Sequence, residues 1–313
     1  MFTRFHRTVS TILVFAAAQT LSAQLPSSPS PQDSDLAAIH QLLDEARFAQ
    51  AEPALRTYVA THPLSAEAKY LLADTLFRED KPKESLTAYT EAAKLRTPSP
   101  SDLLNVGLDY VLLNDYPDAD KWITQSVKGN PLDENAWYSL GRIKYTDNKF
   151  HDAQNCFEKA LELAPRDVRA ENNLGLTYEG LNEEDKAVAA YRTAIAWQQN
   201  SAHPSEQPLL NLSIILIERE KYDEALPLLT QANTISPHDP QIHTQLGRLY
   251  LAQAQYRKAQ AELETAIQLS PGVAATHFQL GQVYRHEGET EKAKAEFATA
   301  ASLNGTHSSP QTQ

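Results

Sequence analysis

The sequence is poor in the residues and motifs on which most catalytic and metal-binding sites depend. It has one cysteine, Cys156, which excludes an internal disulfide, and we expect that residue to be a buried filler on a helix. It contains no His-Glu-x-x-His metal motif, no glycine-rich phosphate loop and no nucleophile elbow. His238 and His243 are five residues apart across an expected helix start, which is poor geometry for a shared metal ion. The sequence therefore predicts no catalytic residue, no metal site and no cofactor.

Positive charge is also scarce. The 313 residues include 28 lysines and arginines against 40 aspartates and glutamates, so the formal net charge is −12. A protein that binds nucleic acid needs a basic face to neutralise phosphates, and no basic run is present. We therefore do not expect nucleic acid as a partner.

Long apolar runs are absent. The most apolar stretch, Ile12–Ala18, is too short to span a bilayer, and it follows a positive start at Arg4 and Arg7. Small residues come next, which is typical of a secretory signal peptide over residues 1–23. An uncleaved N-terminal anchor or a chance apolar start are the alternatives.

The residues after the signal predict where the mature chain goes. Gln24 stands where a bacterial lipoprotein needs its lipidated cysteine, so this chain is not a lipoprotein. We expect an exported protein, periplasmic or secreted, with no membrane span in the mature chain. Residues 24–33 are rich in proline and serine and predict a disordered linker, and residues 306–313 predict a flexible tail.

What the sequence does have is a repeat of 34 residues. Gly281 and Tyr284 recur 34 residues earlier as Gly247 and Tyr250, and the same spacing continues back through the chain. The register slips once, at a four-residue insertion. The units start near residues 32, 66, 100, 134, 168, 206, 240 and 274, and the insertion is Ala202–Ser205.

Each repeat position has a physical role. Small residues at repeat positions 8, 20 and 27 let two antiparallel helices approach closely, and larger residues at positions 4, 7, 11 and 24 fill the gaps. Proline at position 32 ends the second helix. We expect a first helix, helix A, over positions 2–14 and a second, helix B, over positions 18–30. No unit can bury its apolar face alone, so the stack is the folding unit.

This pattern resembles the tetratricopeptide repeat family. The resemblance covers about eight units and implies an all-α fold, a right-handed superhelical α-solenoid over residues 34–305. It also implies a concave groove lined by helix A, where ligands of this family are usually held. We expect the inserted Ala202–Ser205 to cause a slight break in superhelical regularity between the fifth and sixth units.

Repeat position 6 should face that groove and carries mostly amides. An amide side chain donates and accepts, so a row of them can pair with the backbone of an extended peptide. Arginines and a tyrosine at neighbouring positions could bind an acidic side chain or anchor a partner. The predicted partner-binding residues are Asn105, Asn173, Asn211, Gln245, Gln279, Arg142, Arg169, Arg248 and Tyr138. The competing interpretations are amides common to the family and solvated charge.

Three functional hypotheses follow from the sequence. The first is a non-enzymatic scaffold or adaptor that binds a protein or extended peptide in its groove. The second is a structural or assembly subunit of an envelope secretion or pilus-type complex, associating through the ends of the solenoid. Because no polar capping helix follows Ala301, the C-terminal end is a candidate surface for self-association. The third is an enzyme accessory or cryptic enzyme.

Overall fold

A computed structural model describes residues 31–307, which form sixteen α-helices and no strand. The predicted signal peptide, residues 1–23, lies outside the described residues. Helix α1 begins at Pro31, inside the predicted linker, and helix α16 continues to His307, inside the predicted tail. The helices are α1 Pro31–Asp44, α2 Phe48–Thr61, α3 Ala66–Arg78, α4 Pro82–Ala93, α5 Pro100–Leu112, α6 Tyr116–Gly129, α7 Glu134–Thr146, α8 Phe150–Leu163, α9 Val168–Gly180, α10 Glu184–Trp197, α11 Gln207–Glu218, α12 Tyr222–Ile235, α13 Pro240–Ala252, α14 Tyr256–Leu269, α15 Ala274–His286 and α16 Thr290–His307.

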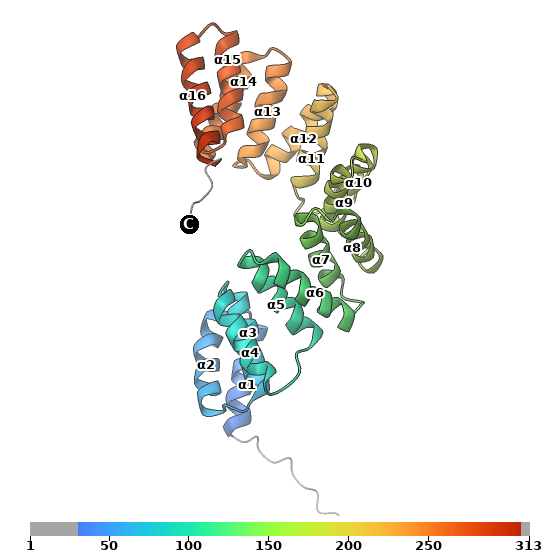
Figure 1. Cartoon of the computed structure of the whole chain (residues 1–313), viewed down its shortest axis with the longest axis vertical. Coiled ribbons are helices and arrows are strands. Elements are labelled where there is room, and N and C mark those ends of the chain that lie inside the picture. Colours follow the sequence, from blue (N-terminus) through green and yellow to red (C-terminus); the bar gives the residue numbers. More distant parts are fainter. Residues whose placement is uncertain (1–30, 308–313) are drawn as a thin grey trace, which may run out of the picture.

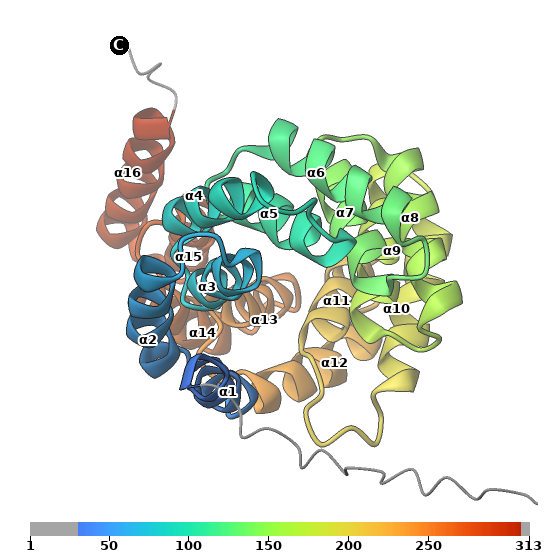
Figure 2. The ribbon, with the colours of Figure 1, turned by 90° about the horizontal axis from the view of Figure 1, so that it is seen from below.

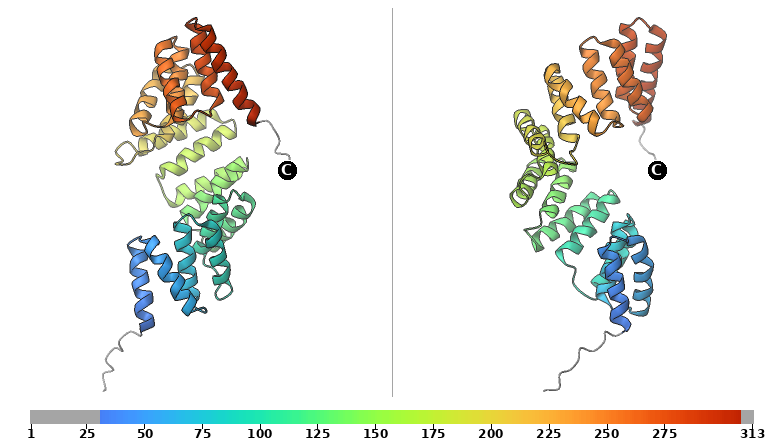
Figure 3. Two further views of the ribbon diagram at one scale, coloured as in Figure 1. Left: turned by 90° about the vertical axis from the view of Figure 1, so that its left-hand side faces the viewer. Right: turned by 180° about the vertical axis from the view of Figure 1, so that it is seen from behind.

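The helices stack as eight consecutive antiparallel pairs, one for each predicted unit (Figure 1). Seen from below, α3, α5, α7, α9 and α11 lie toward the middle of the molecule, and α2, α4, α6, α8, α10 and α12 lie outside them (Figure 2). The path of the pairs curves into a superhelix, with the first and last pairs at opposite ends of the molecule (Figure 3). The α-solenoid predicted from the repeat is therefore confirmed, and helix A of each unit faces inward.

Close approach within a pair depends on the small residue at position 8. In the fifth unit this residue is Gly175, and a Cβ placed there would lie 2.4 Å from the ring of Tyr191. Tyr191, at position 24, is fully buried, as is Ala187 at position 20. The predicted packing of small residues against large ones is confirmed.

The turn between helices A and B is the same in every unit. Its second residue, at position 15, has a positive φ, and the next residue donates a backbone hydrogen bond to the carbonyl at position 11, as Gln255 does to Tyr250 at 2.8 Å. This closes the end of helix A in the manner of a Schellman motif. The position-15 residues are Ala46, Asp80, Asn114, Asn148, Asn182, Glu220, Ala254 and Gly288.

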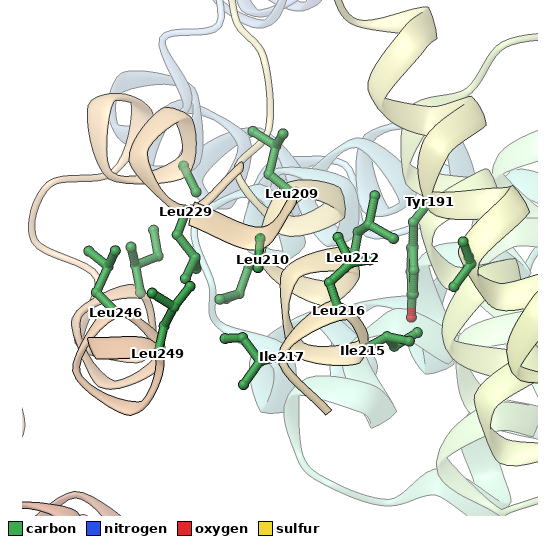
Figure 4. Packing of buried hydrophobic residues seen from close by; sticks show 14 of the residues in the cluster. Tyr191, Leu209, Leu210, Leu212, Ile215, Leu216, Ile217, Leu229, Leu246 and Leu249 are labelled. Atoms are coloured by element: carbon green, nitrogen blue, oxygen red, sulfur yellow. The ribbon is translucent and has the colours of Figure 1, made fainter. Parts of the chain in front are cut away.

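The insertion Ala202–Ser205 lengthens the connection between α10 and α11. The buried amide of Gln198 closes this loop, because its Nε2 donates to the carbonyl of Ser205 at 2.7 Å and its Oε1 accepts from the Ser205 amide at 2.8 Å. The apolar core continues past the loop, with Tyr191 of α10 beside Leu212 and Leu216 of α11 (Figure 4). A break in superhelical regularity at this joint stays a prediction.

Candidate partner-binding groove

Three of the predicted binding residues meet around a fourth, Tyr138, on the concave side. Tyr138 of α7 is half-buried, and its hydroxyl accepts a hydrogen bond from Asn173 Nδ2 of α9 at 3.3 Å. Two guanidinium groups lie over its ring, Arg169 at 4.9 Å and Arg142 at 6.0 Å from the centroid. Cations over an aromatic face are attracted by the ring electrons. We call Tyr138, Arg142, Arg169 and Asn173 the tyrosine–arginine cluster.

The two arginines of the cluster differ in their pairing. Arg169 is held by Asp167 through contacts of 2.8 Å and 3.2 Å, so its charge is matched. Arg142 is exposed and forms no ion pair with any carboxylate of residues 31–307. In a chain of net charge −12, an unpaired guanidinium beside an aromatic ring is suited to bind an anionic group.

The amides at position 6 do not form a free row of donors. Asn105 Nδ2 donates to Asp74 Oδ1 at 2.9 Å and to the Tyr89 hydroxyl at 3.1 Å. Asn211 Nδ2 donates to Asn172 Oδ1 at 3.0 Å, and Asn173 Nδ2 also donates to the carbonyl of Arg169 at 2.8 Å. These nitrogens therefore fasten one helix A to its predecessor or to its own preceding turn.

The oxygens of the same amides are left for other partners. The side-chain oxygens of Asn105, Asn173 and Asn211 accept no hydrogen bond from the described residues. Gln245 and Gln279 differ, because their Oε1 atoms are buried and lack a partner within residues 31–307. The groove thus offers amide acceptors at three positions, which is a narrower property than the predicted ladder of donors and acceptors.

A polar hollow opens on the concave side of the second to fourth units. Its volume is about 650 Å³. Carboxylates outnumber guanidinium groups around it, and Asn105 lies in its wall. The lining residues are Glu67, Tyr70, Leu71, Asp74, Arg78, Arg96, Ser99, Ser101, Asp102, Leu104, Asn105, Asp133 and Asn135. The groove is therefore more acidic here than at the tyrosine–arginine cluster, a difference that the repeat pattern of amides and arginines does not predict.

The last predicted site residue, Arg248, lies away from the cluster. It is half-buried on α13, and its NH2 group is 3.5 Å from Glu218 Oε1 of α11. Arg248 therefore ties two neighbouring helices and has a matched charge, so its position does not favour it as an anchor for a partner.

The structure also settles the surroundings of Cys156. Its side chain is 5% exposed, as predicted for a filler, and burial raises the pKa of its thiol to about 12. Within residues 31–307, no three histidine, cysteine or acidic side chains are grouped to hold a metal ion. None of the helices in this range is both long enough and apolar enough to cross a membrane.

Comparison with known proteins identifies the architecture. A tetratricopeptide repeat model matches residues 36–101, 140–204 and 244–306, and a second such model matches residues 216–268. The chain is 24% identical over 236 residues to the BBSome complex member BBS4 of Mus musculus, a match over 64% of this chain and 44% of that protein. The chain spans less than half the length of this relative and of others that it matches.

Solved structures agree with the family models. A tetratricopeptide repeat protein from Parabacteroides merdae ATCC 43184 is similar with a TM-score of 0.63 and 18% identity, over 80% of this chain and 98% of that one. PilW, a widely conserved type IV pilus biogenesis factor, is similar with a TM-score of 0.57 and 21% identity, over 64% and 90%. Because the family models cover more than half of its sequence, the chain belongs to the tetratricopeptide repeat family.

Proposed function

We propose that this protein is a non-catalytic scaffold that holds an extended segment of another polypeptide in its concave groove. The tyrosine–arginine cluster is the observation that carries the proposal. Arg142 presents an unpaired charge on the concave side, and Tyr138 provides an aromatic surface beside it. Aromatic residues and arginines are the residues that most often dominate binding energy at protein interfaces.

The chemistry of the cluster indicates which part of a partner it binds. A carboxylate of the partner would pair with Arg142, and the neighbouring Arg169 would add a second positive charge. The free oxygens of Asn105, Asn173 and Asn211 would accept backbone N–H groups of the same segment, because an extended chain leaves these donors unpaired. We therefore propose an extended segment with an acidic side chain.

Export to the cell envelope is part of the proposal and rests on residues 1–23. The alternative is a structural subunit that associates through its ends. The surface of α16 gives that alternative little support, because the exposed large apolar side chains of the described residues include none from this helix.

Site-specific photo-crosslinking in the native cell tests the groove. A photoreactive residue is placed at Ser139 on the concave face of α7 or, as a control, at exposed Gln125 on outer helix α6. We expect covalent capture of a partner from Ser139 and not from Gln125. Capture from Thr299 on α16 and not from Ser139 would favour association through the C-terminal end.

Two substitutions then test the cluster itself. R142A combined with R169A should reduce capture from Ser139 at least about tenfold, because removing hydrogen-bonded charges at an interface costs more than 1.4 kcal/mol. R257A is the matched control, since Arg257 is an exposed arginine on outer helix α14 that forms no ion pair within residues 31–307. Unchanged capture in the double variant, with unchanged helical melting, would exclude the tyrosine–arginine cluster as the anchor.

A further inference from the structure

The two C-terminal units share an arrangement built around a buried histidine. His243 of α13 has its Nδ1 2.7 Å from Glu262 Oε2 of α14, and its Nε2 is 3.0 Å from the carbonyl oxygen of Pro237. One repeat later, His277 is 2.7 Å from Glu296 Oε2 and 2.9 Å from the carbonyl oxygen of Pro271. Both histidines are 7% exposed. We call these two sets the histidine–glutamate clamps.

The fourth unit shows how the contact to the prolyl carbonyl is made. Trp137 occupies the same repeat position as the two histidines, and its Nε1 donates to the carbonyl of Pro131 at 2.9 Å. An indole N–H can only donate, and a carbonyl oxygen can only accept. The histidine Nε2 therefore takes the place of the indole nitrogen and must also carry a hydrogen.

The second ring nitrogen then has no proton of its own in the neutral state. A neutral imidazole protonated at Nε2 has a bare lone pair at Nδ1, and this lone pair would face a carboxylate oxygen at 2.7 Å. Two acceptors at that distance repel each other. The contact needs one more proton, whether it resides on the imidazole or on the carboxyl group.

We propose that each histidine–glutamate clamp holds one such proton, so that helices A and B of the last two units are fastened to each other when the clamps are protonated and loosen when they are not. The carbonyl in each clamp follows helix B of one unit, while the histidine and the glutamate belong to the next. Loss of the extra proton therefore breaks the contact between helices A and B within one unit, while the Nε2–H contact to the carbonyl of the preceding unit persists. The fourth unit carries Trp137 at the same position, and this contact has no titrating group and does not respond to pH.

The two residues of the clamp occur together in the sequence repeats. Histidine at position 4 and glutamate at position 23 occur together in the seventh and eighth units, and neither occurs in units one to six. Position 4 of those six units holds Asp35, Lys69, Leu103, Trp137, Glu171 and Leu209, and position 23 holds Ala54, Ala88, Trp122, Cys156, Ala190 and Leu228. This co-occurrence indicates that the two side chains act together.

The charged neighbours of the clamps are also repeated. On the connection from α12, His238 and Asp239 precede His243, and Asp239 caps α13 by accepting from the Gln241 amide. Around Glu262 lie Tyr250 of α13 and Lys258 of α14, whose Nζ is 5.2 Å from the centroid of the Tyr250 ring.

The eighth unit repeats this environment. Around Glu296 lie Tyr284 of α15 and Lys292 of α16, with Nζ 5.1 Å from the Tyr284 ring, and Glu264 of α14 accepts from the Tyr284 hydroxyl at 3.0 Å. Neither lysine forms an ion pair with Glu262 or Glu296. The imidazole is thus the hydrogen-bonding partner of each carboxyl group.

Peptide-resolved hydrogen exchange on the full chain tests the proposal. Protection of α13–α16 is compared at pH 6 and pH 9, after correction for the intrinsic pH dependence of exchange, with α7 and α8 as the internal reference. A hydrogen bond lost at each clamp predicts about a fivefold loss of protection in α13–α16 at pH 9. The reference helices, whose unit carries Trp137 in place of the histidine, should change less than about twofold.

A double substitution tests whether the extra proton causes the pH response. In E262Q/E296Q, each glutamine amide can donate to a neutral Nδ1, so the clamp closes without an extra proton. Protection of α13–α16 should then become independent of pH, while E291Q, which neutralises an exposed carboxylate on α16, should keep the response of the natural sequence.

Nitrogen-detected NMR of the histidine rings gives an answer even if the double variant folds poorly. At pH 6 the natural chain should show two imidazoles whose Nδ1 atom carries or shares a proton, and both should lose that proton on alkaline titration. The proposal would be overturned by Nδ1 atoms that neither carry nor share a proton at any pH of the titration, or by a pH response that persists in E262Q/E296Q.

Discussion

At the scale of the single residue, Asp109 is unusual because it is an acidic residue with a buried side chain. Its side chain is fully buried on α5, and neither carboxylate oxygen has a hydrogen-bond partner within residues 31–307. The hydroxyl of Ser85, which lies nearby, donates instead to the carbonyl of Ala73 at 3.0 Å. Burial raises the pKa of Asp109 to about 7, because a charged group is costly away from water.

The raised pKa makes the stability of the solenoid depend on pH. An unfolded aspartate has a pKa of about 3.9, so between about pH 4 and pH 7 the folded chain binds the proton that the unfolded chain releases. The free energy of unfolding therefore falls as pH rises through this window. Above about pH 7 the full cost of the buried charge is present and constant.

We predict that D109T stabilises the protein at pH 8. Two other units carry threonine at the same repeat position, where Thr75 and Thr177 each donate to the carbonyl four residues earlier at 2.7 Å. Each pKa unit corresponds to about 1.4 kcal/mol, so the free energy of unfolding should rise by roughly 2–4 kcal/mol at pH 8. Urea unfolding followed by circular dichroism measures the change.

The same measurement at low pH is the control for D109T. Near pH 4 the carboxyl group is protonated in the folded state and about half protonated in the unfolded state, so the difference between the variant and the natural sequence should fall below about 1 kcal/mol. An equal difference at both pH values would show that the buried charge is not its cause.

At the scale of the element, the turn between helices A and B places a residue with positive φ in every unit. Residues other than glycine, asparagine and aspartate are strained in this conformation, by about 1 kcal/mol or more. Ala254, with φ of 56°, carries this cost, whereas Gly288 at the same position in the last unit does not.

We predict that A254G raises the free energy of unfolding by about 0.5–1 kcal/mol, because glycine adopts the left-handed conformation without a steric penalty. The control is A252G, at an exposed alanine two residues earlier in the last turn of α13. There the backbone is helical, so glycine should lower the free energy by a similar amount. If both variants shift the thermal midpoint in the same direction, left-handed strain at Ala254 is not the controlling factor.

Most helix bounds were predictable to within about one residue because of the repeat, but α1 begins earlier, at Pro31, α4 ends earlier, at Ala93, and α16 continues to His307. Position 8 needs a small residue opposite the large one at position 24, as Gly175 and Tyr191 show, and this constraint fixes the register. The left-handed turn residue was not predictable, since alanine, aspartate, asparagine, glutamate and glycine all occupy position 15. Backbone hydrogen bonds impose that conformation, so the residue type at position 15 varies and the sequence does not predict it.

The candidate site was predictable in position but not in orientation. The register places Asn105 on α5 and Asn173 on α9, and their role in binding a partner stays a prediction. The direction of each amide depends on the side chain that the preceding helix A brings to it, which is Asp74 for one and Tyr138 for the other. Such contacts join residues more than thirty positions apart, and the identity of one does not determine the other.

At the scale of the whole molecule, the insertion Ala202–Ser205 poses the question of whether the stack is one body or two. Each unit of a solenoid contacts its neighbours alone, so a weak joint would divide it. The largest fully buried side chains include Tyr191 just before the insertion and Leu209 just after it. Both belong to one apolar cluster that continues to Leu249 on α13.

We therefore predict that cutting the loop does not separate the halves. Limited proteolysis within residues 199–205, where the chain has no regular helix, should give two fragments that co-elute in size-exclusion chromatography and melt in one transition. The buried contacts between α10 and α11 survive such a cut. The hydrogen bonds between Gln198 and Ser205 hold the loop and can be removed without disturbing those contacts. Q198A should consequently speed the cleavage, because it frees the loop, and leave the association of the fragments unchanged. Fragments that separate in the natural sequence would mean that the solenoid consists of two independent stacks, and that the groove from Asn105 to Gln279 is not one continuous binding surface.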